Sequence, residues 1–481
     1  MKKGFIIFSL FVHSVSMFAQ WQLDVRLTNN PANSYTSFNN AWCIASSGSV
    51  VHIVWEDRRD GNDEIYYKRS IDAGESWEAD TRLTNNTAAS WNPSVTVSGS
   101  VVHVVWRDDR DGNYETYYKR SIDGGVSWGT DTRLTNNSAV SAYPSVTVSG
   151  SVVHVVWHDL RDGNNEIYYK RSIDGGVSWE ADTRLTNNTN DSSLPSVTVS
   201  GSVVHVVWQD FRDGNYELYY KRSIDGGVSW GADTRLTINS SFSERPSVTV
   251  SGSVVHVVWQ DARDGNYEIY YKRSIDGGVS WGADTRLTIN AAESWSPSVT
   301  VSGSIVHVVW RDERDGNREI YYKRSLDAGV SWGAEDTRLT NNTSGSSLPS
   351  VTVSGSVVHV VWWDSRDGNP EIYYKRDPTG NPIGIININS EIPNQFSLSQ
   401  NYPNPFNPNT IIRFKIKDSR LTTLKVFDVL GREVSTLVNE QLKPGTYEVD
   451  FDGSNYPSGV YFYSLYINGE LRDSKKMVLI K

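Results

Sequence analysis

The chain repeats one segment with a fixed period, and this feature limits its fold more than any other. The segment Ser-Ile-Asp-Gly-Gly-Val-Ser-Trp recurs six times with small variations, and its tryptophans lie 51 residues apart. These tryptophans are Trp77, Trp128, Trp179, Trp230, Trp281 and Trp332. A constant spacing in this range is typical of repeat architectures, in which each repeat is one supersecondary unit.

One repeat predicts four short strands. In residues 144–188, an alternating run at 144–150 is followed by the apolar, β-branched run 151–159 and by the strand-like run 166–171. Residues 177–186 supply the fourth run, and Asp-Gly turns precede the third and fourth runs. The repeat has no helical period. Four strands joined by tight turns predict one blade of a β-propeller.

A second motif, Trp-x-Asp-x-Arg-Asp-Gly-Asn, gives the number of blades. It begins at Trp55, Trp106, Trp157, Trp208, Trp259, Trp310 and Trp362. The seventh repeat stops after Arg376 and lacks its fourth strand, whereas residues 21–30 align with residues 77–86, which contain that strand in the first repeat. We therefore expect an all-β, seven-bladed propeller in which the N-terminal strand completes the last blade and closes the ring.

The recurring Ser-x-Asp-x-Gly-x-x-Trp segment has a structural role. In the third copy Asp174 can accept backbone N–H bonds, Gly176 can adopt a positive φ, and Trp179 can fill the space between sheets. The segment resembles the Asp box of bacterial neuraminidase repeats in sialidase-like propellers. The resemblance implies the fold rather than an activity, because the box lies far from the catalytic centre in that family. The box aspartates are Asp72, Asp123, Asp174, Asp225, Asp276 and Asp327.

The composition changes after residue 377. All eighteen tryptophans precede residue 364, residues 378–395 form a Pro/Gly/Asn-containing linker, and residues 396–481 alternate as strands. This pattern predicts a small C-terminal β-sandwich. Its segments Asn401-Tyr-Pro-Asn-Pro-Phe-Asn-Pro, Val426-Phe-Asp-Val-Leu-Gly-Arg and Ser458-Gly-Val-Tyr-Phe resemble the type A C-terminal sorting domain of type IX secretion. The resemblance implies the type IX machinery as a partner, and release from the cell or attachment to its outer surface.

The N-terminus and the composition limit the remaining possibilities. Residues 1–19 have a cationic start, an apolar stretch and a terminal Ala19, so we expect a secretory signal peptide followed by a propeller over residues 20–377. No later stretch approaches the roughly 20 apolar residues of a membrane span. Cys43 is alone, which excludes an intrachain disulfide and favours a buried, inert thiol. The net charge of −10, without a basic cluster, argues against nucleic acid binding. We expect a monomer without a cofactor.

Several residues with catalytic or metal-binding potential occur in every blade. We interpret the blade histidines as hydrogen-bonded core residues rather than zinc ligands, because equivalent residues of neighbouring blades point in rotated directions. The loop from Asp108 to Glu115 resembles a calcium loop, but an arginine stands at its third position, so we expect a hairpin tied by Arg–carboxylate pairs and no metal. These histidines are His52, His103, His154, His205, His256, His307 and His359.

The blade arginines resemble in type, but not in arrangement, the carboxylate-binding triad of sialidases. Each has the same aspartate two residues before it and the same Asp-Gly-Asn after it, whereas a catalytic site must break the symmetry of the ring. We favour structural pairing and assign no catalytic residue. These arginines are Arg59, Arg110, Arg161, Arg212, Arg263, Arg314 and Arg366.

The differences between repeats indicate a binding face. They concentrate in the links between blades and in the second-to-third loops, which emerge on the same face, and loops on a rigid scaffold often carry function. The position after each blade tryptophan varies most clearly: Glu56, Arg107, His158, Gln209, Gln260, Arg311 and Trp363. Aromatic candidates for contact with sugar rings or a protein partner are Trp91, Trp295, Tyr114, Tyr216, Tyr267, Phe211 and Trp363.

These observations favour a secreted or cell-surface propeller that binds a glycan or a protein ligand through this face. Two alternatives stay open. The first is a sialidase-like glycoside hydrolase, and the second is a purely structural surface protein, for which near-identical repeats are sufficient.

Overall fold

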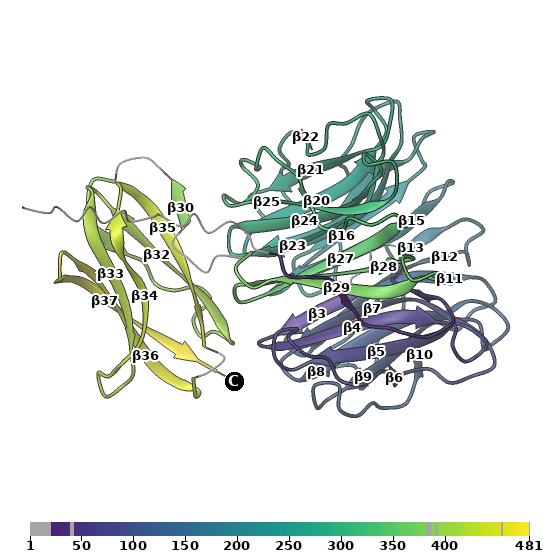
Figure 1. The fold of residues 1–481 in the computed structure, drawn as a ribbon, viewed down its shortest axis with the longest axis horizontal. Coiled ribbons are helices and arrows are strands. Elements are labelled where there is room, and N and C mark those ends of the chain that lie inside the picture. The colour runs from purple at the N-terminus through teal and green to yellow at the C-terminus, as the bar shows by residue number, and fades with distance from the viewer. Residues whose placement is uncertain (1–20, 39–42, 381–385, 390–392, 454–455, 481) are drawn as a thin grey trace, which may run out of the picture.

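The computed structural model describes residues 21–38, 43–380, 386–389, 393–453 and 456–480. The expected signal peptide therefore lies outside the described residues. Within the described ranges the chain forms strands β1 to β37 and no helix, so it has no helical segment there that could cross a membrane. Figure 1 shows two bodies, a ring of blades coloured from purple to green and a smaller yellow-green sandwich.

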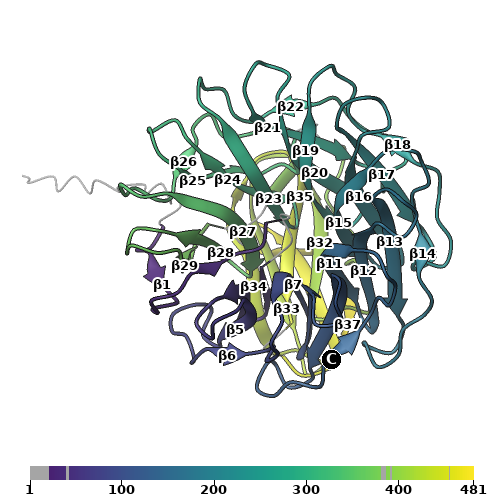
Figure 2. The same ribbon diagram turned by 90° about the vertical axis from the view of Figure 1, so that its right-hand side faces the viewer.

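Seven antiparallel sheets form the ring, and the expected seven-bladed propeller is confirmed (Figure 2). Blade 1 contains β2 (Ser34–Tyr35), β3 (Ile44–Ser47), β4 (Val50–Asp57), β5 (Glu64–Ser70) and β6 (Thr81–Arg82). Blade 2 contains β7 (Ser90–Ser98), β8 (Val101–Asp108), β9 (Glu115–Ser121) and β10 (Thr132–Arg133). Blade 3 contains β11 (Ser141–Ser149), β12 (Val152–Asp159), β13 (Glu166–Ser172) and β14 (Thr183–Arg184).

The remaining blades keep this plan, with the first strand innermost and the fourth at the rim. Blade 4 contains β15 (Ser192–Ser200), β16 (Val203–Asp210), β17 (Glu217–Ser223) and β18 (Thr234–Arg235). Blade 5 contains β19 (Ser243–Ser251), β20 (Val254–Asp261), β21 (Glu268–Ser274) and β22 (Thr285–Arg286). Blade 6 contains β23 (Ser294–Ser302), β24 (Ile305–Asp312), β25 (Glu319–Ser325) and β26 (Thr337–Arg338), and blade 7 contains β27 (Ser346–Ser354), β28 (Val357–Asp364) and β29 (Glu371–Asp377).

The N-terminus completes blade 7, as the sequence predicts. Strand β1 (Val25–Arg26) pairs with β29 in antiparallel register, with Val25 opposite Tyr374. Asp24 forms ion pairs with Arg366 at 2.7 Å and with Lys375 at 2.9 Å, which are the pairs that the aspartate of strand four makes within the other blades. The ring is thus closed by hydrogen bonds, ion pairs and packing between the two ends of the propeller.

The Asp boxes join each blade to the next. In the box of blade 3, the Asp174 carboxylate accepts the backbone N–H groups of Val177 at 3.0 Å and Ser178 at 2.9 Å. Gly176 has a φ of 84°, and a Cβ added there would lie 1.9 Å from the hydroxyl oxygen of Tyr118 in blade 2. Trp179 packs edge-on against the same Tyr118, with ring centroids 4.9 Å apart. The box therefore accepts only glycine at the point where the neighbouring tyrosine enters.

The blade histidines lie directly beneath this contact. His103 Nδ1 is 2.7 Å from the Tyr118 hydroxyl, and both side chains are buried. Burial lowers the pKa of His103 to about 4, which keeps its imidazole neutral at neutral pH. The same histidine–tyrosine pair occurs in all seven blades, so these histidines occupy the buried, hydrogen-bonded core position that the repeat predicts.

Serine hydroxyls connect the innermost strands around the propeller axis. The Ser247 hydroxyl accepts the backbone N–H of Val299 in the next blade at 3.3 Å, and the Ser350 hydroxyl accepts that of Cys43 at 3.2 Å. The latter bond joins blade 7 to blade 1. Cys43 is fully buried, and burial raises the pKa of its thiol to about 12, as expected for an inert core cysteine.

The C-terminal body is a β-sandwich of two four-stranded sheets, as predicted. The first sheet has the order β30 (Ile386–Asn389), β35 (Gly445–Asp452), β32 (Asn409–Ile416) and β31 (Ser397–Leu398). The second has the order β34 (Glu433–Leu442), β33 (Arg420–Phe427), β36 (Gly459–Ile467) and β37 (Glu470–Leu479). Phe414, Leu424 and Leu465 are fully buried between the sheets. Strand β30 lies within the segment that was expected to be a linker. It pairs with β35 and therefore belongs to the sandwich.

The sandwich lies against one face of the ring (Figure 1). We call this the box face; it carries the Asp boxes and the turns between first and second strands. A Cβ added to Gly303, in the β23–β24 turn, would lie 2.9 Å from Asp450 Oδ2 on β35. Ser304 in this turn is buried, whereas its counterparts Ser100, Ser151, Ser202 and Ser253 are exposed. The opposite face, which carries the second-to-third loops and the links between blades, is called the variable face.

Candidate functional site

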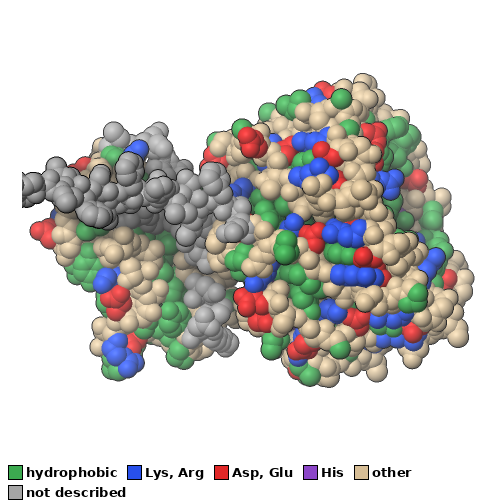
Figure 3. All heavy atoms as spheres, viewed as in Figure 1, with side chains coloured by type: hydrophobic (Ala, Val, Ile, Leu, Met, Phe, Trp, Pro, Cys, Tyr) green, Lys and Arg blue, Asp and Glu red, His purple; other side chains and the backbone are tan. Residues whose placement is uncertain are grey.

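The seven blade arginines are engaged within their own blades. Arg110 makes a two-bonded pair with Asp108, from Nε to Oδ1 at 2.8 Å and from Nη2 to Oδ2 at 2.5 Å, and its Nη1 donates to Asp131 at 2.6 Å. The guanidinium also stacks on Tyr117 at 4.4 Å. Figure 3 shows basic and acidic side chains alternating in short bands over the ring. This is the expected Arg–carboxylate hairpin, and its carboxylates already have cationic partners.

The candidate aromatic residues are all partly buried on the variable face, and they form separate clusters. Trp91 packs on Tyr114 with centroids 5.6 Å apart, and Tyr267 packs on Trp295 at 4.6 Å. Two further clusters are formed by Phe211 with Tyr216 at 5.0 Å, and by Trp363 with Tyr35 at 5.5 Å. The structure thus distributes the candidates around the ring rather than gathering them into one pocket.

Two arginines belong to these clusters, although sequence reasoning assigned them no role. The Arg107 guanidinium lies 4.7 Å from the Trp91 ring and 4.4 Å from the Tyr114 ring, in cation–π geometry. Arg311 lies 4.9 Å from the Trp295 ring in the same way. Trp91 is the cross-strand partner of Arg107, and Trp295 is that of Arg311. The shared Trp and Arg at equivalent positions of blades 2 and 6 were the signal that could have revealed these pairs.

Near the variable-face end of the innermost strand, at its third residue, six blades have a strained residue. In six blades a non-glycine residue with φ between 50° and 54° immediately precedes a proline. This left-handed conformation is rare for residues with a Cβ, and proline restricts its predecessor further, so each position costs about 1–3 kcal/mol. The six residues are Asn92, Tyr143, Leu194, Arg245, Ser296 and Leu348. The equivalent position of blade 1 lies outside the described residues.

In three blades, a side chain from the preceding blade supports the strained residue. Glu56 Oε2 accepts the backbone N–H of Asn92 at 3.1 Å. Gln209 Oε1 accepts that of Arg245, and Gln260 Oε1 accepts that of Ser296, both at 3.1 Å. Burial raises the pKa of the Glu56 carboxyl to about 7, although the bond from Asn92 acts in the opposite direction. In these blades, the residue after the blade tryptophan therefore stabilises the link to the next blade through a hydrogen bond to its strained residue.

A segment of blade 1 reaches over the centre of this face. The Arg245 guanidinium lies 3.8 Å from the Phe38 ring, and its Nη1 donates to the Phe38 carbonyl at 3.2 Å. The Phe38 ring is also 6.3 Å from Tyr143 in blade 3. Phe38 thus links blades 1, 3 and 5 near the propeller axis.

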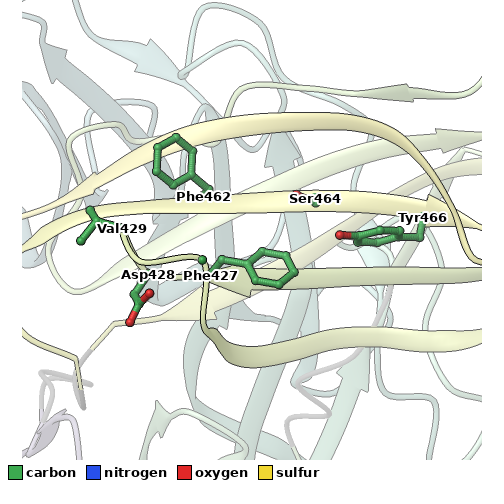
Figure 4. A pocket seen from close by; sticks show the side chains of 7 residues that line it. Phe427, Asp428, Val429, Phe462, Ser464 and Tyr466 are labelled. Carbon is green, nitrogen blue, oxygen red and sulfur yellow. The ribbon is translucent and has the colours of Figure 1, made fainter.

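A pocket of about 330 Å³ lies on the sandwich. Figure 4 shows Phe427, Phe462 and Tyr466 lining it on the outer side of the sheet that contains β33 and β36, with Asp428 and Val429 at one end. Phe427, Asp428, Val429 and Phe462 belong to the segments that suggested a sorting domain, and Tyr466 lies four residues beyond Phe462 on the same strand.

Comparisons with known proteins identify the class. Residues 400–481 match the model of the secretion system C-terminal sorting domain. No curated protein matches the chain in sequence. The chain is thus a seven-bladed propeller joined to a type IX sorting domain, and this domain indicates export to the cell surface or the medium.

Solved structures resemble the propeller at low sequence identity. The polysaccharide lyase Uly1 has a TM-score of 0.51 and 10% identity, over 74% of this chain and 99% of that one. A protein of unknown function from Dyadobacter fermentans has a TM-score of 0.46 and 12% identity, over 74% and 98% of the two chains. The phage phi92 endosialidase has a TM-score of 0.45 and 12% identity, over 74% and 68%. At such identities, the likeness to Uly1 establishes the fold alone.

Proposed function

We propose that this exported propeller binds a glycan through its variable face. One observation carries the proposal: aromatic and cationic side chains gather on the links between blades and around the second-to-third loops, on the face opposite the sorting domain. The proposed ligand-binding residues are Trp91, Trp295, Tyr114, Tyr216, Tyr267, Phe211 and Trp363. Aromatic rings stack on the apolar faces of sugars, and the fold is shared with a polysaccharide lyase, so a glycan is the first class to test before a protein ligand.

Hydrolysis in the manner of sialidases receives less support. That reaction needs one nucleophile and one acid–base group, held once in an asymmetric pocket. The candidate arginines are instead paired identically in every blade, as Arg110 is with Asp108. We therefore assign binding rather than bond cleavage to the variable face.

A glycan-binding screen of the mature chain tests this proposal, run beside a panel of fluorogenic glycosides. We expect binding of at least one glycan class and no turnover. Replacing both Trp91 and Trp295 by alanine should weaken that binding without unfolding the propeller. Turnover of a sialoside that one arginine substitution abolishes would overturn the proposal and favour the hydrolase.

The proposed export route uses both ends of the chain, with residues 1–19 as the signal peptide and residues 396–481 as the sorting domain. Deleting residues 396–481 in a host with type IX secretion should leave a folded propeller in the periplasm. Deleting residues 1–19 should leave the whole chain in the cytoplasm. Surface display of the first variant would contradict the sorting role.

A further inference from the structure

We propose that Arg107, Tyr143 and His158 form a carboxylate-binding site between blades 2 and 3, here called the Arg107 site, and that the ligand of the variable face is an acidic glycan. This inference rests on the proposed glycan binding. It starts from a difference between blades at one position, the residue that follows the blade tryptophan.

In blades 1, 4 and 5 that residue supplies an acceptor oxygen. Glu56, Gln209 and Gln260 each accept the backbone N–H of the strained residue in the next blade, at 3.1 Å in all three cases. In these three blades the backbone N–H of the strained residue therefore has a hydrogen-bond acceptor.

In blades 2 and 3 the same residue is a cation or an imidazole. Arg107 and His158 offer no acceptor oxygen to the backbone N–H groups of Tyr143 and Leu194. Arg107 Nε and His158 Nδ1 are themselves buried without a hydrogen-bond partner, and the His158 side chain is 7% exposed. Within the described residues, Arg107 makes no ion pair. Arg107 Nε belongs to a cation, and a charged donor is costly to leave unpaired in a buried position, so Arg107 favours an external acceptor.

The three side chains lie close together. The Tyr143 ring centroid is 5.1 Å from the His158 ring and 5.5 Å from the Arg107 guanidinium carbon. The guanidinium packs against both the Trp91 and the Tyr114 ring, which are in edge-on contact with each other, and these contacts restrict its direction. A planar guanidinium so fixed binds a carboxylate through two parallel hydrogen bonds. The neighbouring rings of Trp91 and Tyr143 offer surfaces for the sugar that carries this carboxylate.

The protein itself shows which anion suits the position. In blade 1 the equivalent residue is Glu56, whose carboxylate accepts the backbone N–H of Asn92. A carboxyl oxygen in blade 1, like the amide oxygens of blades 4 and 5, thus accepts such an N–H. We therefore infer a uronate or another carboxylated sugar as the ligand of the Arg107 site.

His158 provides a spectroscopic readout. Burial, with the nearby Arg107 cation, lowers its pKa to about 4, while Asp159 and Asp191 act in the opposite direction. A carboxylate bound beside the imidazole favours the protonated form, so the pKa of His158 should rise on binding. NMR titration of the His158 ring, with and without ligand, measures this rise. An unchanged pKa in the presence of saturating ligand would contradict the placement of the anion.

The decisive variant is Arg107→Gln, because glutamine is the residue that blades 4 and 5 use at this position. It should supply the missing acceptor to Tyr143 and preserve the fold, while removing the cation. The mature chain is titrated calorimetrically with oligosaccharides of galacturonate, glucuronate and mannuronate, each beside its carboxyl-reduced form. We expect wild type to prefer at least one acidic form, and R107Q to lose about tenfold or more of that affinity.

Arg318→Gln is the matched control. It removes a half-exposed cation from the variable face in blade 6, far from the Arg107 site, and it should change the affinity less than about twofold. Equal binding of the acidic and reduced forms, or an unaffected R107Q, would overturn the Arg107 site while leaving the glycan-binding proposal standing. Failure of every glycan in the array and in these titrations would overturn both.

Discussion

The box face and the variable face of the propeller are built from the same repeat but treat their polar groups differently. On the box face the same contacts recur: the histidine–tyrosine hydrogen bond in all seven blades, and the glycine that admits the tyrosine in each of the six Asp boxes. On the variable face the side chains change between blades: the residue after the blade tryptophan is Glu56 in blade 1, Arg107 in blade 2 and His158 in blade 3. The comparison teaches that one face holds the ring together while the other is free to diversify.

Acidification should weaken the box face most. Folding lowers the pKa of six blade histidines from 6.5 to about 4 or about 3, so their contribution to stability is complete above pH 6.5 and is lost as the pH falls toward 4. These six are His52, His103, His154, His205, His256 and His359. Each pKa unit corresponds to about 1.4 kcal/mol per histidine. We expect the melting temperature to fall steeply over this range, by far the largest of these effects.

Two observations sharpen this expectation. Glu56 acts in the opposite direction, because its raised pKa adds stability as the pH falls from about 7 toward 4.5, but it is a single group. His205→Gln should reduce the proton uptake on unfolding by about one proton, measured as the pH dependence of the unfolding free energy. A slope identical to that of wild type would exclude the histidines as the cause.

Deleting residues 21–28 should open the ring. The deletion removes β1, the Asp24 ion pairs and the Trp21 ring, which packs edge-on against Tyr322 at 5.0 Å. Loss of a packed tryptophan alone costs about 3–5 kcal/mol, so the unfolding free energy should fall by at least that amount in denaturant titrations. Leu23→Ala is the control, since Leu23 is 89% exposed. An unchanged melting temperature after the deletion would refute closure by this strand.

Gly176→Ala should destabilise the box face by about 2–4 kcal/mol, because the new methyl group meets the Tyr118 hydroxyl and the backbone has a positive φ. Gly129→Ala serves as the comparison. Gly129 lies in the equivalent connection of blade 2, between the third and fourth strands. A Cβ added there would meet nothing nearer than the Arg120 carbonyl oxygen at 3.5 Å. Similar losses at the two glycines, in thermal unfolding, would argue against a special role for the tyrosine contact.

Changes on the variable face should affect stability least. Trp91→Ala combined with Trp295→Ala removes two partly buried rings, and we expect a loss of about 1–2 kcal/mol in unfolding free energy. Glycan affinity should fall far more, by about tenfold or more per stacked ring. Unfolding of the propeller by this double substitution would show that the two tryptophans stabilise the fold rather than bind the ligand.

The sequence was most informative where residues repeat. The seven tryptophan motifs and the match between residues 21–30 and 77–86 predicted the blade count and the closure, because ring geometry leaves few other uses for such segments. The predicted burial of the histidines and the predicted Arg–carboxylate pairing agree with the hydrogen bonds and ion pairs that recur in the blades. Their partners follow from the strand pairing of each blade.

The variable face was less predictable. The left-handed residues before proline lie at a bulge in the innermost strands of blades 2 to 7, which the pattern of side chains does not reveal. The stacking of Arg107 on Trp91 depends on the same register. The placement of the sandwich against the Gly303 turn is a tertiary contact between segments that share no pattern. The sequence did not predict strand β30, because an alternation over four residues is too short to distinguish a strand from a linker.

Because blade 7 is built from both ends of the propeller, the ring can close only when both ends are present. In blade 7 the Trp21 ring replaces a box tryptophan, and Gly380 provides the carbonyl that accepts from Arg324, so both ends contribute to one substitute box. A chain that stops early, or that loses its first strand to a protease, leaves β29 or an earlier strand with an unpaired edge. Such an edge can pair with another chain. Only a chain that keeps both ends of the propeller can therefore close the ring and cover this edge.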